Sequence, residues 1–361
     1  MNYKNEPLHI STPVPNGTYE VTVSVTAHEN ITLTILSQSR RFMIQDAHMA
    51  KGDARDFTFN VSVCDYHKNN EAYTNVSGVE LDILCDGSFS AVSAVSPVKI
   101  PIIYIAGDST VTDQPAEYPY NPKSTYCGWG QMFPRLLNTG IAVENHAQSG
   151  SNTMDFLKVN FNAFKDKITE GDFLIVEFGH NDQKVETLDA FGGYSKNLRY
   201  FVNFAREKGA CPILVSPINR IIFKEDGTLL NLLGDYRNAV KTVCEEMNVP
   251  FIDLWTRTTG FFEAAGALKA WDYFWGNDTD RDYTHTNDIG GDIVSRFVAD
   301  EILKNNIKPI SDLIKKDMIS VEMPKRNRTA VPPNPKEIEH LKTIGLVNTP
   351  LADLDKDITK I

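Results

Sequence analysis

The sequence of 361 residues lacks the features that mark a membrane or secreted protein. It contains no apolar run of the roughly 18–20 residues that a membrane-spanning helix requires. Its first residues, 1–7, contain no apolar segment typical of a secretory signal. We therefore expect a cytoplasmic protein without a membrane partner, or a secreted one if a signal was trimmed from this sequence.

Cysteine and basic residues are also scarce. The five cysteines are widely spaced and form no Cys-x-x-Cys pair, which argues against a disulfide scaffold and against a zinc knuckle. The 36 lysines and arginines are outnumbered by 47 aspartates and glutamates, and the net charge of −11 disfavours a nucleic-acid partner. No Gly-x-Ser-x-Gly elbow occurs, which excludes the usual α/β-hydrolase nucleophile. We expect neither a cofactor nor a metal.

Residues 1–98 are rich in segments that alternate polar and apolar side chains. This period of two, with many β-branched residues, is typical of antiparallel strands that have one face in water. The pattern predicts an N-terminal all-β sandwich domain. The segments with the clearest alternation are residues 19–25, 31–35, 57–63 and 79–83.

Residues 99–310 follow a different pattern, in which short apolar runs alternate with helical stretches. Runs that are apolar on both faces suit buried parallel strands, and their alternation with helices predicts an α/β domain with a doubly wound sheet. The charged, proline-rich residues 311–361 are expected to form a C-terminal extension. The apolar runs are 102–105, 141–143, 173–178, 213–216 and 251–254, and the expected helices are 153–167, 194–208, 234–247 and 290–304.

Polar residues follow three of these runs and precede the last helix. Gly107-Asp108-Ser109 follows the first run, Gly150 follows the second, and Gly179-His180-Asn181-Asp182 follows the third, while Asp282 and His285 lie shortly before the helix expected from residue 290. Binding sites in parallel sheets form at the carboxyl ends of the strands, so we expect these groups to meet.

These residue types together suit acyl transfer. Ser109 becomes a nucleophile when a base takes its proton, His285 can be that base, and Asp282 can hold its tautomer. The backbone N–H groups of Ser109 and Gly150 and the side-chain amide of Asn181 can stabilise an oxyanion. Each fragment alone has a simpler interpretation as a turn, a helix start or a structural histidine, but their joint placement favours catalysis.

The four groups of residues that end in Ser109, Gly150, Asp182 and His285, here called the first to fourth blocks, resemble those of the SGNH, or GDSL-type, hydrolases. They are closest to the blocks of the rhamnogalacturonan acetylesterase branch. The resemblance covers about residues 99–310 and implies a flavodoxin-like parallel sheet, which some bacterial members carry behind an N-terminal β-sandwich. It implies that Ser109 is the nucleophile, His285 the base and Asp282 its partner, with Ser109, Gly150 and Asn181 as the oxyanion hole. It further implies that Asp108, His180 and Asp182 brace the loops.

The same branch has a Trp-Gly-Gln after its first block, here Trp129-Gly130-Gln131. It often has arginine and then serine after the second-block glycine, where this chain has Ser151-Asn152. An arginine there would suit an acidic sugar. Trp129, Trp271 and Trp275 are candidate sugar-stacking residues, and Tyr126 is a further candidate for the cleft wall; the two later tryptophans, four residues apart, could instead pin a helix.

We therefore expect a serine esterase that removes acetyl groups from carbohydrate, with acetylated rhamnogalacturonan or other pectic oligosaccharides as its substrate partner. One alternative is a general GDSL esterase or lipase acting on small acyl esters. A metallophosphoesterase is another, because Gly179–Asp182 is similar to a Gly-Asn-His motif and Asp65-Tyr66-His67 supplies an Asp-x-His. The third is a non-catalytic glycan-binding protein. The β-sandwich could bind glycan, cover the cleft or mediate self-association.

Overall fold

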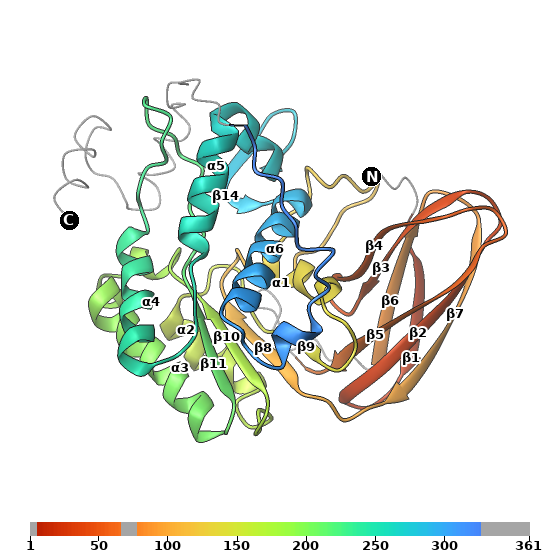
Figure 1. Cartoon of the computed structure of the whole chain (residues 1–361), viewed down its shortest axis with the longest axis horizontal. Coiled ribbons are helices and arrows are strands. Elements are labelled where there is room, and N and C mark those ends of the chain that lie inside the picture. The colour runs from red at the N-terminus through yellow and green to blue at the C-terminus, as the bar shows by residue number, and fades with distance from the viewer. Residues whose placement is uncertain (1–5, 66–77, 326–361) are drawn as a thin grey trace.

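The computed structural model describes residues 6–65 and 78–325 of the chain. Its N-terminal part is a sandwich of two antiparallel sheets, with strand orders β1-β6-β3-β4 and β5-β2-β7 (Figure 1). The strands are β1 (Leu8–Pro13), β2 (Gly17–Ala27), β3 (Ile31–Ser37), β4 (Arg41–Met49), β5 (Ala54–Val63), β6 (Gly78–Cys85) and β7 (Phe89–Pro97).

Alternation along the strands builds the core of this sandwich. Val21, Val23 and Val25 of β2 point inward and pack in one cluster with Leu33 and Ile35 of β3. The four alternating segments of the sequence lie in β2, β3, β5 and β6, as predicted. Strand β4 escaped prediction because its first residues face the second domain, so polar side chains there are buried instead of alternating with solvent.

The second part is a parallel sheet of five strands in the order β12-β11-β10-β8-β9. Numbered from β8, this order is the flavodoxin-like 2-1-3-4-5, so the predicted α/β class is confirmed. The strands are β8 (Ile102–Gly107), β9 (Ala142–Asn145), β10 (Phe173–Glu177), β11 (Cys211–Val215) and β12 (Phe251–Ile252).

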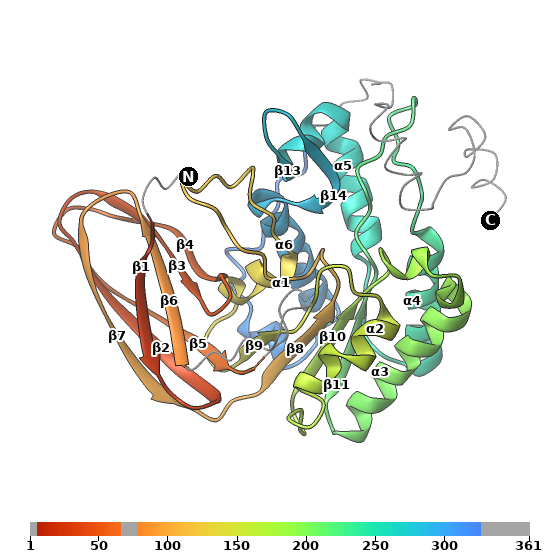
Figure 2. The ribbon, with the colours of Figure 1, turned by 180° about the vertical axis from the view of Figure 1, so that it is seen from behind.

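Helices cover both faces of this sheet. Alternate residues of one strand enter different cores: Ile103 and Ile105 pack beneath α1, α5 and α6, whereas Tyr104 and Ala106 pack beneath α2, α3 and α4 (Figures 1 and 2). The helices are α1 (Trp129–Met132), α2 (Thr153–Lys158), α3 (Ser195–Glu207), α4 (Gly234–Met247), α5 (Leu254–Ala270), α6 (Asp288–Lys304) and α7 (Ile310–Leu313).

Four helices lie where the helical periodicity predicts them, although α2 is shorter than expected and is continued by a 3₁₀ turn, and α6 begins two residues early. Helix α5 was missed. Its apolar residues are spread around the helix without one clear stripe, and Gly266 interrupts it with a left-handed backbone (φ 76°). The last apolar run forms strand only at its first two residues, because Asp253 caps α5 by accepting the N–H of Thr256.

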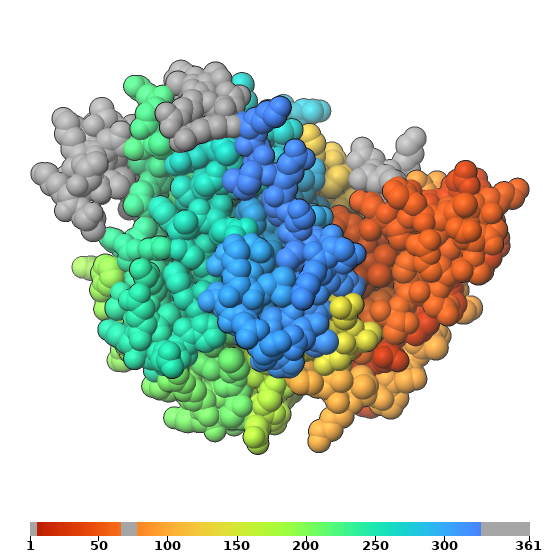
Figure 3. Space-filling view, in the orientation of Figure 1, coloured from red at the N-terminus to blue at the C-terminus, as the bar shows by residue number. Residues whose placement is uncertain are grey.

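The two parts lie against each other (Figure 3), with β4 packed on α1 and on the 3₁₀ turn Phe133–Leu136 and β5 next to β9. Arg41 of β4 pairs with Asp113 at 2.8 Å across this junction, and both side chains are buried. Beyond α6, α7 packs under the same core, and residues 326–361 of the predicted extension lie outside the described part. None of the helices in residues 6–65 and 78–325 is both long and apolar enough to cross a bilayer.

Candidate active site

Ser109, His285 and Asp282 form one hydrogen-bonded chain. Ser109 Oγ lies 2.7 Å from His285 Nε2, although the two residues are 176 positions apart. His285 Nδ1 lies 2.7 Å from Asp282 Oδ2. Ser109 sits in the turn at the carboxyl end of β8, and the other two residues lie in β14 (Arg281–Thr286), which pairs with β13 (Phe274–Gly276). The structure thus brings the three predicted residues together in the order that nucleophilic catalysis requires.

The backbone of β14 holds Asp282 in place. Its Oδ1 accepts the backbone N–H groups of Thr284 at 2.7 Å and of His285 at 2.9 Å. Burial raises the pKa of Asp282, but the hydrogen bond and charge of His285 outweigh it and hold that pKa below its ordinary value. An ionised Asp282 keeps the proton on His285 Nδ1, which leaves Nε2 to accept the serine proton.

Ser109 and the Asp282–His285 pair both lie outside helices. Asp282 and His285 both lie in β14, where the Asp282 carboxylate accepts the backbone N–H of His285 and contacts its imidazole. Ser109 does not open a helix directly, because the turn after β8 leads into an irregular segment that continues to α1. In both places the tertiary contacts, and not a local helix, set the geometry.

A cavity of about 350 Å³ contains this chain of residues. The predicted oxyanion groups of Gly150 and Asn181 line the same cavity. Gly150 has φ +78°, a left-handed backbone that glycine adopts without strain, so the residue type is required by the loop as well as by access to its N–H. The full lining comprises Ser109, Gln114, Tyr126, Ser149, Gly150, Asn181, Lys184, Asp282 and His285.

The amide of Asn181 is fixed at both ends. Its Oδ1 accepts a hydrogen bond from Lys184 Nζ at 2.8 Å, and its Nδ2 donates to the carbonyl of Ser151 at 3.0 Å. These partners define which end of the amide carries the hydrogens. One amide hydrogen remains for a ligand, so Lys184 and Ser151 together orient the third donor of the predicted oxyanion hole.

The predicted bracing residues form a buried polar layer beneath the cavity. Asp108 Oδ1 accepts the N–H of Thr110 at 3.0 Å and its hydroxyl at 2.8 Å. His180 Nδ1 lies 3.7 Å from Asp108 Oδ2, too far for a good hydrogen bond. Burial lowers the pKa of His180 to about 4, so this imidazole is neutral near pH 7.

Two further carboxyl groups in this layer have raised pKa values. Burial, reinforced by the charge of Asp108, raises the pKa of Glu177 to about 8. Burial also raises the pKa of Asp182 to about 7, although Asp182 accepts the N–H of Thr153 at 3.0 Å and its hydroxyl at 2.5 Å. Asp182 thereby ties the start of α2 to the block that carries Asn181.

Trp129 is not a cleft residue, which corrects its assignment from the sequence. Its side chain is 0% exposed, and its indole Nε1 donates to Glu177 Oε2 at 2.5 Å. The Trp-Gly-Gln block therefore belongs to the buried layer. Trp271 and Trp275 do not line the catalytic cavity either: Trp271 packs edge-on against Tyr283, and Trp275 stacks on Tyr126 with ring centroids 4.8 Å apart.

Sequence reasoning missed three residues of the cavity wall, Gln114, Ser149 and Lys184. Gln114 Nε2 donates to Ser149 Oγ at 3.0 Å, and both lie in irregular segments. Lys184 follows the third block by two residues in a 3₁₀ turn, so proximity to that block was the available signal. Tyr126, a secondary candidate, does line the cavity, with its ring edge-on to His285.

Among the residues that the structure describes, the one group with metal-ligand spacing is Cys64, Glu144 and His146. It lies at the domain junction, and none of its members lines the cavity of Ser109. Glu144 accepts hydrogen bonds from Ser62 at 2.5 Å and from His146 at 3.0 Å, and burial raises the pKa of the Cys64 thiol. Ser62 and His146 thus occupy both carboxylate oxygens of Glu144.

Comparison with known proteins identifies the family. The model of the GDSL-like lipase/acylhydrolase family matches residues 105–293. The chain belongs to this family. It is 36% identical over 216 residues to rhamnogalacturonan acetylesterase RhgT of Bacillus subtilis, covering 57% of this chain and 91% of that protein. It is 34% identical over 218 residues to the probable rhamnogalacturonan acetylesterase YesY of the same organism, covering 59% and 97%.

The crystal structure of the YxiM protein of Bacillus subtilis resembles both parts of the chain. It matches with a TM-score of 0.53 and 25% sequence identity, covering 83% of this chain and 81% of that one. These findings confirm the SGNH resemblance and the fold predicted with it. Membership of an acylhydrolase family also makes the chain a carboxylic ester hydrolase, and weighs against the metallophosphoesterase alternative, whose Tyr66 and His67 lie outside the described residues.

Proposed function

We propose that this chain is a carbohydrate acetylesterase that acts on acetylated rhamnogalacturonan or related pectic oligosaccharides. The observation that carries the proposal is the Ser109–His285–Asp282 chain, with both links at 2.7 Å, in one cavity with Gly150 and Asn181. The relatives named as rhamnogalacturonan acetylesterases support the substrate class.

The reaction follows from this geometry. Ser109 Oγ attacks the acetyl carbonyl carbon while its proton passes to His285 Nε2. The oxyanion is stabilised by the N–H groups of Ser109 and Gly150 and by the amide of Asn181. The sugar oxygen leaves with the proton from His285, which yields acetyl-Ser109 and the free hydroxyl. Water then attacks the acetyl group with His285 as base, and acetate and Ser109 are released.

The lining of the cavity favours a short acyl group and a polar leaving group. None of the nine lining residues has an aliphatic side chain, and Tyr126 is the one aromatic residue among them. A lipase that binds a long acyl chain needs extended apolar surface, because burial of that chain supplies its affinity. An acetyl group needs no such surface, and the hydroxyl, amide and carboxylate groups suit sugar hydroxyls.

Lys184 is our candidate for contact with an acidic sugar. The chain has Ser151 where relatives in this branch often carry arginine, but Lys184 Nζ supplies a cation in the same cavity. An ammonium has three donors, and one is used by Asn181. The other two can meet the carboxylate of a galacturonate residue next to the acetylated position.

The test is acetate release from acetylated rhamnogalacturonan oligosaccharides and from acetylated xylo-oligosaccharides, by wild type and Ser109→Ala. We expect a kcat/KM at least about tenfold higher on the uronate-containing substrate, since one charge-assisted contact contributes on the order of 1.5–3 kcal/mol. Ser109→Ala should release no acetate from either. Equal or better activity on the xylo-oligosaccharides would contradict the pectic assignment, and acetate release by Ser109→Ala would contradict the serine mechanism.

A further inference from the structure

Arg40 of the sandwich domain enters the catalytic domain directly behind the active site. It lies in the turn between β3 and β4 with a left-handed backbone (φ 69°). Its side chain is almost fully buried, and its guanidinium lies 5.2 Å from the ring centroid of Phe42 and 5.7 Å from that of Tyr120. A buried guanidinium is costly unless it is paired. Both Nη atoms of Arg40 have acceptors, whereas its Nε has none among the described residues.

Three acceptors for Arg40 come from segments that carry the cavity wall. Its Nη1 donates to the carbonyl oxygens of Gln114 at 3.2 Å and of Tyr126 at 3.4 Å, and its Nη2 forms an ion pair with Asp288. Gln131 reinforces this set, because its Nε2 donates at 2.9 Å both to the backbone carbonyl of Arg40 and to that of Gln114.

The segments held by Arg40 also hold the catalytic base. Tyr126 pairs with Asn287 in a short antiparallel bridge, and the N–H of Cys127 donates to the carbonyl of Thr286 at 3.0 Å. The ring of Tyr126 stands edge-on to His285, with 5.7 Å between centroids. Arg40 therefore contacts both bridged segments, one at Tyr126 and the other at Asp288. His285 lies in the second segment, two residues before Asn287 of the bridge.

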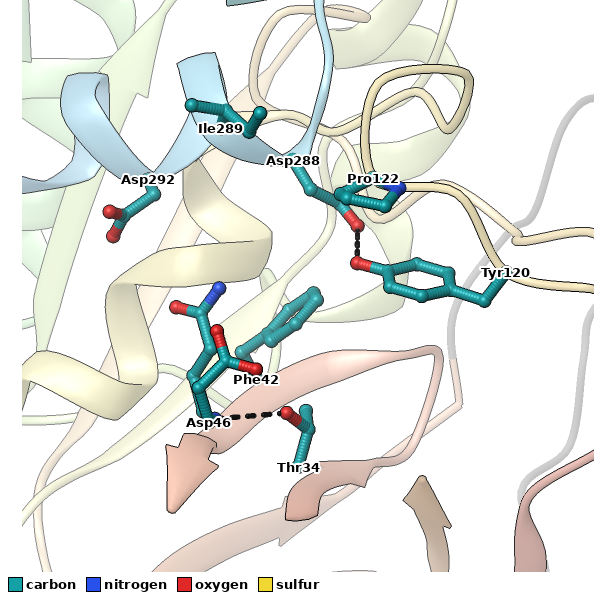
Figure 4. Close-up of a pocket in the computed structure, with 9 residues that line it drawn as sticks. Thr34, Phe42, Asp46, Tyr120, Pro122, Asp288, Ile289 and Asp292 are labelled. Atoms are coloured by element: carbon teal, nitrogen blue, oxygen red, sulfur yellow. Dashed lines mark hydrogen bonds between the residues drawn. The ribbon is translucent and has the colours of Figure 1, made fainter. Parts of the chain in front are cut away.

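The carboxylate of Asp288 is shared by Arg40 and Tyr120. Asp288 begins α6, and its carboxylate also accepts the hydroxyl of Tyr120 (Figure 4). A cavity of about 190 Å³ separates β4 from α6 here, with Thr34, Phe42 and Asp292 among its lining residues (Figure 4). Across this cavity the guanidinium of Arg40 provides a direct ion pair from the sandwich to the start of α6.

We propose that Arg40 is a positioning residue of the esterase, through which the β-sandwich holds Tyr126 and His285 in their catalytic arrangement. This rests on the proposed function, because it assigns the sandwich a role in that same reaction. The sandwich is then a structural part of the active site. A displacement of reacting groups by about 1 Å lowers turnover by about 10²-fold, so loss of this support should appear in kcat.

The domain junction offers a matched control at its other end. Asn60 of β5 accepts the N–H of Gly140 at 2.7 Å. Gly140 lies just before β9, at the amino end of the sheet, whereas the catalytic groups lie at the carboxyl ends. Asn60→Ala therefore weakens the docking of the two domains without touching the segments that Arg40 holds.

The experiment measures kcat and KM for 4-nitrophenyl acetate, with thermal melting, for wild type, Arg40→Met, Arg40→Lys and Asn60→Ala. We expect Arg40→Met to lower kcat about 10- to 100-fold with KM within about twofold, and Asn60→Ala to keep kcat within about twofold. Arg40→Lys should recover part of the loss, because an ammonium can still pair with Asp288 but cannot reach both carbonyls. The neutral pair Arg40→Met/Asp288→Asn provides a folded comparison if the single variant unfolds, because it leaves no unpaired buried charge.

A folded Arg40→Met or double variant with wild-type kcat would overturn the proposal. So would an equal loss of kcat in Asn60→Ala, which would mean that docking as a whole is what matters. Ser109→Ala in the same assay distinguishes a failure of the proposed function from a failure of the role assigned to Arg40. Activity that survives Ser109→Ala would overturn the proposed function and the role of Arg40 together, whereas loss of activity in Ser109→Ala with no effect at Arg40 would overturn the role of Arg40 alone.

Discussion

Two histidine–aspartate pairs lie at the carboxyl end of the central sheet, one facing the cavity and one beneath it. In the cavity pair, His285 and Asp282 are 2.7 Å apart, and the other imidazole nitrogen meets Ser109. In the buried pair, His180 and Asp108 are 3.7 Å apart, and neither nitrogen of His180 has a hydrogen-bond partner among the residues that the structure describes.

The comparison shows that residue type alone does not assign a catalytic role. Both pairs have the composition of a base and its orienting acid, and both lie in recognisable sequence blocks. Access and hydrogen-bond geometry separate them: His285 reaches the cavity, whereas His180 is 2% exposed and has its pKa lowered to about 4 by burial. Under the proposed mechanism the cavity pair moves the proton, and the buried pair is placed to support the loops.

The largest expected effect tests this division directly. His285→Ala should lower kcat by about 10³-fold or more, as far as Ser109→Ala, because both remove a member of the same proton-transfer unit. His180→Leu should lower the melting temperature and change kcat by less than about tenfold, because the His180 side chain is buried and does not line the cavity. Asp282→Ala should lower kcat less than His285→Ala does. A His180 variant as inactive as His285→Ala would end the distinction between the two pairs.

A smaller effect is expected at the oxyanion amide. Asn181→Ala should lower kcat about 10²- to 10³-fold, which is the usual loss for one such donor. Lys184→Met removes the hydrogen bond to Asn181 Oδ1 and should lower kcat by about tenfold, since Ser151 still holds the other end of the amide. Steady-state kinetics on 4-nitrophenyl acetate, an uncharged substrate, isolates this role from sugar recognition. Unchanged kcat in Lys184→Met would remove Lys184 from the orientation of the amide.

The buried polar layer should instead affect how the stability of the protein depends on pH. The pKa of Asp182 is raised from 3.8 to about 7, so between these values the folded protein keeps a proton that the unfolded chain has lost. Stability therefore falls as pH rises through this window, by at most about 1.4 kcal/mol per pH unit from this group. Asp182→Asn keeps the acceptor for Thr153 and should flatten that slope. Urea unfolding at pH 5 and pH 7 gives the change in the free energy of unfolding between these pH values. The same change in wild type and in Asp182→Asn would contradict the raised pKa.

The smallest effect on catalysis is expected at Trp129. Trp129→Phe removes the hydrogen bond to buried Glu177 and should lower the free energy of unfolding by about 1–3 kcal/mol. KM for acetylated oligosaccharides should stay within about twofold, because the side chain is fully buried. Trp275→Ala serves as the comparison, because it removes the ring that stacks on Tyr126 of the cavity wall. A large rise of KM in Trp129→Phe with stability unchanged would restore the sugar-stacking assignment.

These cases also show what sequence can and cannot reveal here. Period-two alternation and apolar runs identified four of the seven sandwich strands and the order of the α/β elements, because those patterns follow from burial on one or two faces. The blocks around Ser109, Gly150, Asn181 and His285 were recognisable because each lies in a short contiguous motif. Their meeting at the carboxyl ends of parallel strands follows from topology.

What escaped prediction depends on contacts between distant segments. Gln114 and Ser149 belong to irregular loops that meet through the fold, and Arg40 reaches the cavity wall from another domain. Trp129 was misassigned because its motif lies close to the site in sequence and space, while only the packing shows that its indole points into the buried layer. A one-dimensional pattern carries no information on that direction.

The measurement that tests the central claim most directly is 4-nitrophenyl acetate hydrolysis by wild type and Ser109→Ala, each with and without EDTA. We expect wild-type hydrolysis that EDTA does not reduce and that Ser109→Ala loses, because in the proposed mechanism the serine, histidine and aspartate perform the reaction without a metal. Hydrolysis that persists in Ser109→Ala and disappears with EDTA would contradict the account and point to a metal centre.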